Sequence, residues 1–180
     1  MLMDAERSVL LVVDMQERLL PAIDEGAQVL GHCVWLVRLA QRLRVPVVVS
    51  EQYPRGLGRS VPALREVLPD AAFVEKVFFS CVAGGALQPL PVFGREQWIV
   101  AGTEAHVCVQ QTVLDLRAAG KAVFVVAEAV GSRRQHDREL ALTRMAAGGA
   151  QIVSREMVAF EWLKRAGTDL FREVSRDFIR

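Results

Sequence analysis

Residues 8–14 read SVLLVVD, an almost unbroken apolar run that ends in a carboxylate. Such a run is typical of a strand that is covered on both faces, as strands in a parallel sheet are. The carboxylate of Asp14 is costly to bury unless it is paired. Two interpretations of Asp14 therefore stay open: a strand-end residue that caps the next turn, and a general base or metal ligand.

Five further apolar segments repeat this pattern along the chain. They are PVVVS (46–50), FVEKV (73–77), QWIVA (97–101), KAVFVVA (121–127) and AQIVS (150–154). Amphipathic segments typical of helices lie at 27–43, 105–119 and 135–147, and one or two more follow residue 154. This alternation predicts a three-layer αβα fold with a parallel sheet in the middle. The one long loop, YPRGLGRSVP (53–62), is a candidate for function.

The composition is that of an ordinary globular domain, with 180 residues, 52% of them hydrophobic and 24% charged. The formal net charge is +1, so we expect neither nucleic acid nor a membrane surface as a partner. The first apolar run is too short for a secretion signal, and no apolar stretch approaches the roughly 18 residues of a membrane span. The chain has no GxGxxG motif after the first strand and no P-loop motif. A dinucleotide fold of the usual kind and a P-loop NTPase are therefore disfavoured.

The three cysteines, Cys33, Cys81 and Cys108, are widely spaced and form no CxxC motif. This spacing supports neither a disulfide framework nor a zinc knuckle, and it favours a reducing, cytoplasmic location. Cys108 lies near the start of a predicted helix, where the helix dipole favours a thiolate, so we expect it to be the most reactive of the three. A buried structural role is the alternative, and it fits Cys33 and Cys81 better.

The histidines offer no clear catalytic or metal site. His106 lies two residues before Cys108, and side chains two apart on a helix point about 200° away from each other. We therefore expect His106 to be a helix-start or surface residue. His32 and His136 have no partners at ligand spacing, so a metal site built from these histidines is disfavoured.

Lys76 lies near the end of the predicted strand at 73–77, in an apolar context. Ligands of open α/β sheets bind beyond the carboxyl ends of the strands, where Asp14 and Lys76 both fall. Lys76 is either a solvated strand-end residue or a charge that stabilises the anions of Asp14 and Cys108. Spacing alone does not bring the three residues together.

Five segments of this chain carry a more specific pattern. They are LLVVDMQERLLPAI (10–23), SEQYPRGLG (50–58), EKVFFSC (75–81), GTEAHVCVQQTVLDL (102–116) and VVAEAVGSRRQHDRELAL (125–142). In this order they resemble the isochorismatase-like cysteine hydrolase superfamily, which includes nicotinamidases and N-carbamoyl amidases. The resemblance is closest to the small isochorismatase-domain proteins and covers nearly the whole chain, so we expect residues 1–180 to form a single domain of this family.

The resemblance implies a Rossmann-like sheet of six parallel strands in the order 3-2-1-4-5-6. It also implies a catalytic triad of Asp14, Lys76 and Cys108. Because this order makes strands one and four neighbours at the switch point, it brings Asp14 and Cys108 to the crevice where a ligand is expected.

The implied activity is that of a cysteine hydrolase acting on the C–N bond of a small amide through a thioester on Cys108. The family resemblance also implies a cis peptide at Thr103–Glu104, with the backbone N–H groups of Glu104 and Cys108 forming an oxyanion hole. Gln52 and Tyr53, which follow the second strand, are candidates for contact with a small-molecule substrate.

Two departures from the family narrow this expectation. Metal-dependent nicotinamidases carry histidines around the end of the second strand, but residues 50–53 here read SEQY, so we expect no metal and no other cofactor. True isochorismatases lack the cysteine that this chain has, so isochorismate is not the expected substrate. The alternatives are a non-catalytic binding protein with the same fold and a redox-active thiol protein. The apolar stretch at 157–171 (MVAFEWLKRAGTDLF) and the Trp-bearing first helix suggest a homo-oligomer.

Overall fold

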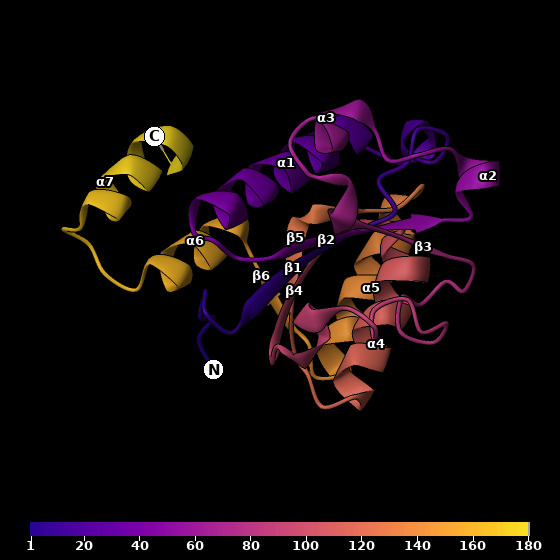
Figure 1. Cartoon of the computed structure of the whole chain (residues 1–180). Coiled ribbons are helices and arrows are strands. Elements are labelled where there is room, and N and C mark those ends of the chain that lie inside the picture. Colours follow the sequence, from indigo (N-terminus) through magenta and orange to yellow (C-terminus); the bar gives the residue numbers. More distant parts are fainter. Residues whose placement is uncertain (180) are drawn as a thin grey trace.

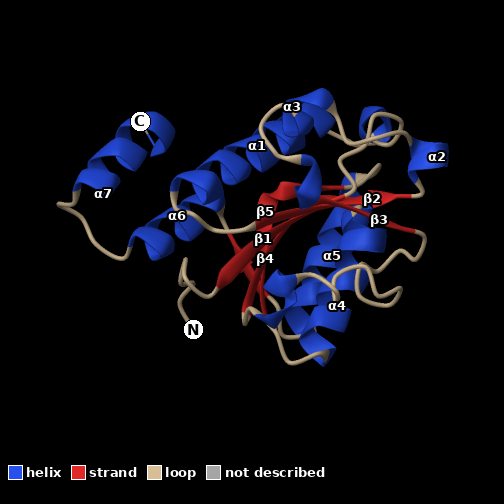
Figure 2. Ribbon diagram, in the orientation of Figure 1, coloured by secondary structure: helices blue, strands red, loops and turns tan. Residues whose placement is uncertain are grey.

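Six parallel strands form one sheet between two layers of helices (Figures 1 and 2). In this computed structural model, which describes residues 1–179, the strand order is β3-β2-β1-β4-β5-β6. The strands are β1 (Ser8–Val13), β2 (Val47–Gln52), β3 (Phe73–Lys76), β4 (Gln97–Thr103), β5 (Ala122–Gly131) and β6 (Gln151–Val153). The expected fold class and strand order are confirmed.

The helices divide between the two faces of the sheet. They are α1 (Gly26–Arg42), α2 (Pro54–Leu57), α3 (Pro62–Arg65), α4 (Gln110–Ala118), α5 (Gln135–Ala147), α6 (Arg155–Leu163) and α7 (Asp169–Val174). Short 3₁₀ turns occur at Leu20–Ala22, Asp70–Ala72 and Pro91–Gly94, and π-helical turns at Ala105–Val109 and Ser175–Ile179. Helices α1 and α6 pack on one face, while α4 and α5 pack on the other (Figure 2).

The alternation of side chains along the strands assigns each residue to one of these faces. On β2, Val49 packs in the core beneath α1 and Val48 packs in the core beneath α4. The same alternation places Ser50 and Gln52 on the α4 face and Glu51 on the α1 face. On β3, Val74 lies on the α4 face, which puts Lys76 there as well.

Several boundaries differ from those expected from the sequence. Strand β5 continues to Gly131, four residues beyond the predicted end, after a register shift of β4 against it between Val100 and Gly102. The segment at 53–62 is not an irregular loop, because Pro54 and Pro62 begin the short helices α2 and α3, where proline has its preferred place.

The end of β4 passes unusually close to β1. Gly102 has a φ of 111°, and a Cβ atom there would lie 2.1 Å from the carbonyl oxygen of Val13. Only glycine fits this conformation and this approach. The hydroxyl of Thr103 then donates to the carbonyl oxygen of Asp14 at 2.9 Å, and the Thr103–Glu104 peptide is cis, as the family resemblance implies. The close approach therefore brings the turn that carries Cys108 to the end of β1.

The C-terminal segment uses much of its apolar surface within the chain. Trp162 is buried and donates to the hydroxyl of Ser8 at 3.0 Å, while Trp35 of α1 packs edge-on against Phe178 at 5.6 Å between ring centroids. This packing removes part of the reason for expecting a homo-oligomer from these residues. Within residues 1–179, no helix is both long and apolar enough to cross a membrane.

Candidate active site

Asp14 follows β1 directly, and its side chain is fully buried. Its Oδ2 atom accepts a hydrogen bond from Lys76 Nζ at 2.7 Å, and its Oδ1 atom accepts one from Ser50 Oγ at 2.6 Å. Both carboxylate oxygens are therefore paired, which offsets the cost of burial. The bond between Ser50 and Asp14 arises because Ser50 pairs in the parallel register with Val13, the residue that precedes Asp14.

Lys76 ends β3 and points into the same buried cluster, with 1% of its side chain exposed. Its ammonium group also donates to Gln52 Oε1 at 2.7 Å, and Gln52 Nε2 donates in turn to the carbonyl oxygen of Val77 at 2.8 Å. Burial alone would lower the pKa of Lys76, but Asp14, Cys81 and Cys108 together outweigh burial and raise the pKa above its usual value. Lys76 therefore stays charged at neutral pH and is fixed in position.

Cys108 lies in the π-helical turn that precedes α4, with 5% of the residue exposed. Burial raises the pKa of its thiol, and the charge of Asp14 and a hydrogen bond to that carboxylate raise it further. Lys76 lowers the pKa of Cys108, as the sequence argument expected, but by less. The expectation that the helix start and Lys76 would together favour a thiolate is therefore corrected: the resting group is a neutral thiol beside a carboxylate.

The other two cysteines have different surroundings. Cys33 on α1 donates to the carbonyl oxygen of Ala129 at 3.5 Å, and burial raises its pKa to about 12, which fits the expected structural role. Cys81 is also fully buried, but it lies within the electrostatic reach of Asp14 and Lys76. Its backbone N–H donates to Thr112 Oγ1 at 2.9 Å.

Three residues near the candidate triad were missed by sequence reasoning: Ser50, Cys81 and Thr112. Thr112 stands four residues after Cys108, a spacing that places two side chains on the same face of a helix. Ser50 ends the second strand, so its side chain faces the crevice at which parallel strands end. Cys81 carries no comparable signal, because it lies in an irregular segment between β3 and β4.

The residues just before Cys108 face the end of β5. Glu104 is largely buried, and its carboxylate accepts a hydrogen bond from Arg133 Nε at 2.9 Å. His106 Nδ1 lies 3.0 Å from Ser132 Oγ, which fits the expectation that His106 does not pair with the thiol. Among residues 1–179, no three His, Cys, Asp or Glu side chains converge as a metal-binding group.

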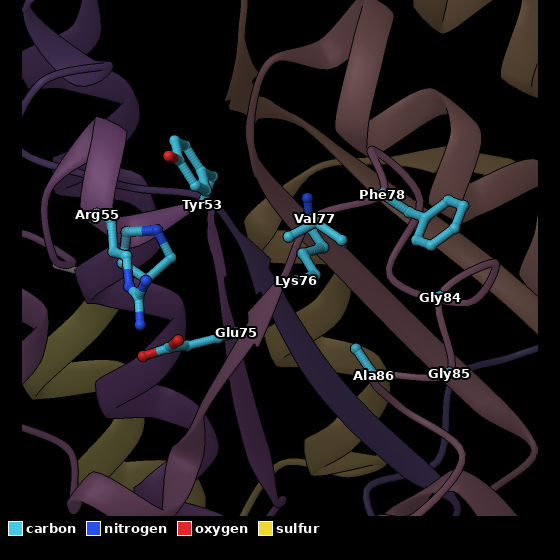
Figure 3. Close-up of a pocket in the computed structure, with 10 residues that line it drawn as sticks. Tyr53, Arg55, Glu75, Lys76, Val77, Phe78, Gly84, Gly85 and Ala86 are labelled. Atoms are coloured by element: carbon cyan, nitrogen blue, oxygen red, sulfur yellow. The ribbon is translucent and has the colours of Figure 1, made fainter.

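A pocket of about 580 Å³ opens beside Lys76 (Figure 3). Figure 3 shows Tyr53 and Arg55 on one side of it, Phe78 and Gly84 on the other, and Lys76 between them. Asp14 and Cys108 do not line this pocket, so it meets the buried cluster through Lys76. Of the two residues expected to contact substrate, Tyr53 lines the pocket and Gln52 holds Lys76.

A family model and relatives of known family both match most of this chain. The Isochorismatase domain model matches residues 8–157. The "Isochorismatase domain-containing protein 1" of Salmo salar is 39% identical over 171 residues, which cover 93% of this chain. The match covers only 59% of that relative, so the chain spans less than two thirds of its length.

Two solved structures share the fold over nearly all of the chain. One is described as the MAR1 ribonuclease from Caenorhabditis elegans, with 32% identity, a TM-score of 0.89, and coverage of 98% of this chain and 91% of that one. The other is the YcaC gene product from Escherichia coli, described as an octameric hydrolase of unknown specificity, with 25% identity, a TM-score of 0.90, and coverage of 99% and 91%. Sequence and structure therefore agree that this chain belongs to the isochorismatase domain family.

Proposed function

We propose that this protein is a cysteine hydrolase that cleaves the C–N bond of a small amide. One observation carries the proposal: the buried carboxylate of Asp14 accepts a hydrogen bond from the Lys76 ammonium group, and its charge raises the pKa of the buried Cys108 thiol. A neutral thiol close to a fixed carboxylate is the arrangement of a nucleophile with its general base.

In the first half of the reaction, Cys108 Sγ attacks the amide carbonyl carbon while its proton passes to Asp14. The tetrahedral intermediate then collapses, the C–N bond breaks, and the proton held by Asp14 moves to the leaving nitrogen. The products of this half are a free amine or ammonia and a thioester on Cys108. Lys76 keeps the carboxylate oriented and balances its charge throughout.

In the second half, a water molecule gives a proton to Asp14 as its oxygen attacks the thioester carbonyl carbon. The C–S bond breaks, the carboxylic acid leaves, and the proton returns to Cys108 Sγ. We assign the oxyanion hole to the backbone N–H groups of Glu104 and Cys108. Losing one such donor typically costs about 3–4 kcal/mol in the transition state. Tyr53, which lines the pocket, is the proposed substrate contact, whereas Gln52 positions Lys76.

Three rival functions make different predictions. A binding protein that only keeps the fold would turn over no amide. A redox protein would oxidise Cys108 reversibly, and Cys81 lies within electrostatic reach of it as a second thiol. A ribonuclease would need to attract a polyanion, which the net charge of +1 does not favour. RNA therefore belongs in the substrate panel as a control for the ribonuclease described among the relatives.

We further propose that the protein forms a homo-oligomer and acts in a reducing, cytoplasmic compartment. Val77, Phe78 and Phe79 are 69%, 57% and 53% exposed beside the pocket, an apolar surface suited to a second copy of the chain. One relative of the same fold is described as octameric. Sedimentation velocity would test assembly, and a monomer at all concentrations would contradict it.

The decisive experiment is a panel of small amides and carbamoyl compounds, assayed with the wild type and with Cys108→Ala. We expect turnover by the wild type alone, together with an acyl adduct on Cys108 in quenched samples measured by mass spectrometry. Turnover should also survive dialysis against EDTA, because we expect no metal. Activity of Cys108→Ala at the wild-type rate would contradict covalent catalysis, and a loss on dialysis that zinc restores would contradict the metal-free reaction.

A further inference from the structure

A second buried carboxylate, Glu51, lies beside Gln52 but on the opposite face of the sheet, and the proposed mechanism does not use it. Its side chain is fully buried. Its Oε1 atom accepts hydrogen bonds from the Ser60 N–H at 2.6 Å and from Arg65 Nη2 at 3.0 Å, and Arg59 Nη1 lies 3.5 Å from Oε2. These partners all belong to the chain just after the pocket wall, so Glu51 must act on that segment.

We call residues 53–60 the wall loop, because Tyr53, Pro54 and Arg55 line one side of the pocket. The wall loop leaves the sheet at Gln52 and returns through Ser60. At its base, the buried Gln16 donates through Nε2 to the carbonyl oxygens of Gln52 at 3.0 Å and Gly58 at 2.7 Å. The returning end is fixed by Glu51 through the Ser60 N–H.

The same carboxylate connects the wall loop to the edge strand. Arg59 Nη1 lies 3.5 Å from Glu75 Oε1 on β3, and Glu75 also lines the pocket (Figure 3). Arg65 lies over the ring of Phe73 on β3, with its guanidinium carbon 4.4 Å from the ring centroid. Glu51 thus joins the two elements between which the pocket opens, the wall loop and β3.

We propose that Glu51 is a positioning residue that fixes the wall loop against β3 and thereby sets the side of the pocket formed by Tyr53, Pro54 and Arg55. It touches neither the substrate nor the Asp14–Lys76 pair, and acts through the loop alone. The consequence for substrate binding rests on the proposed function, whereas the placement of the loop does not.

The first test measures the loop itself and needs no substrate. Limited trypsin digestion cuts after Arg55 once the loop opens locally, because proteolysis follows the population of the open state. In Glu51→Gln, which keeps the volume but loses the charge, we expect cleavage after Arg55 to rise by about tenfold. Cleavage after Arg133 and Arg134, exposed residues beyond β5, should stay unchanged.

Asp70→Asn is the matched control, because Asp70 contacts the same Arg65 at 3.4 Å but is fully exposed. It should leave cleavage after Arg55 at the wild-type rate. Arg59→Gln removes the solvent-facing part of the network, since Arg59 is 61% exposed, and should give a smaller rise in cleavage after Arg55. This variant replaces Glu51→Gln in the test if Glu51→Gln does not fold. The proposal would be overturned if Glu51→Gln, or Arg59→Gln where Glu51→Gln does not fold, were cleaved after Arg55 at the wild-type rate, or if cleavage after Arg133 rose equally.

The second test separates positioning from catalysis. With a substrate from the amide panel, Glu51→Gln should raise KM by about tenfold and change kcat by less than about twofold, the pattern expected when only binding is lost. Alkylation of Cys108 by iodoacetamide should be unchanged in this variant. A fall in kcat with unchanged KM would overturn the positioning role. If no amide is turned over by the wild type, the proposed function fails, but the trypsin result still decides whether Glu51 holds the wall loop.

Discussion

Two buried carboxylates stand at the same end of the sheet, and they differ in what surrounds their cations. Asp14 pairs with Lys76 on the α4 face, where the two side chains are 0% and 1% exposed. Glu51 pairs on the α1 face with Arg65 and Arg59, whose side chains are 28% and 61% exposed. The first pair is sealed from water on both sides, while the second is sealed only around the carboxylate.

This difference decides what each cluster can do. Charges sealed together interact strongly, so the Asp14–Lys76 pair can influence the proton of a neighbouring thiol. Arginines that reach solvent are screened more strongly and are better suited to holding a surface segment. We therefore propose that this end of the sheet serves proton transfer on the α4 face and loop placement on the α1 face.

The largest difference between the clusters should appear in turnover. Cys108→Ala, Asp14→Asn and Lys76→Ala should each lower kcat by about 10⁴-fold or more, and the effects should be strongly non-additive because the three act as a unit. Glu51→Gln should stay within the modest range given above. Steady-state kinetics on the four variants would decide, and additive losses in double variants would contradict a cooperating triad.

The second-largest difference between the clusters should appear in the free energy of unfolding. Lys76→Met leaves the Asp14 carboxylate buried without its cation, which typically costs about 3–5 kcal/mol. The double variant Asp14→Asn with Lys76→Met should recover part of that loss. Glu51→Gln should cost about 1–3 kcal/mol, because its partners reach solvent. Urea unfolding would measure all three, and a Glu51→Gln loss larger than that of Lys76→Met would reverse the comparison.

The two clusters should also lose stability at opposite ends of the pH scale. The pKa of Glu51 is lowered by the Ser60 and Arg65 contacts against the effect of burial, so its contribution is present above about pH 4.3 and is lost as pH falls through the folded pKa. The pKa of Cys108 is raised by burial and Asp14, so its contribution is present below about pH 8.5 and is lost as pH rises.

Unfolding free energies measured against pH would show this. We expect Glu51→Gln to flatten the acid side alone and Cys108→Ala to reduce the loss on the alkaline side alone, each by at most about 1.4 kcal/mol per pH unit. A change on the opposite side in either variant would mean that the pKa directions are wrong.

The smallest effect concerns thiol reactivity. Cys108 should be alkylated by iodoacetamide before Cys33 and Cys81, because it is the least buried of the three. Removing the negative charge in Asp14→Asn should lower the pKa of Cys108, so alkylation at pH 8 should become several-fold faster although turnover is lost. Peptide mapping after limited labelling measures both, and slower labelling in Asp14→Asn would contradict the assigned role of the carboxylate.

The sequence by itself determined the parallel αβα architecture and indicated two residues of the candidate site, Asp14 and Cys108. Continuous apolar runs such as 8–14 alternate with amphipathic segments, and each such pattern is set by neighbouring residues. Asp14 and Cys108 stand at strand and helix termini, and the family resemblance added Lys76, the strand order and the cis peptide. The expected boundaries failed mainly at β5 and at the proline-initiated helices α2 and α3, where only turn chemistry separates helix from loop.

Only the tertiary structure decided the direction in which the pKa of Cys108 is shifted and the proposed role of Glu51. The pKa of Cys108 is a balance of burial, Asp14 and Lys76, and those contributions come from separate strands whose distances no local pattern contains. Glu51 is an ordinary acidic residue in the sequence, next to a residue expected to contact substrate. It becomes distinctive because the fold buries it and brings Ser60, Arg59 and Arg65 around it. Long-range electrostatics and burial arise from the assembled chain, and the sequence specifies them only through the fold.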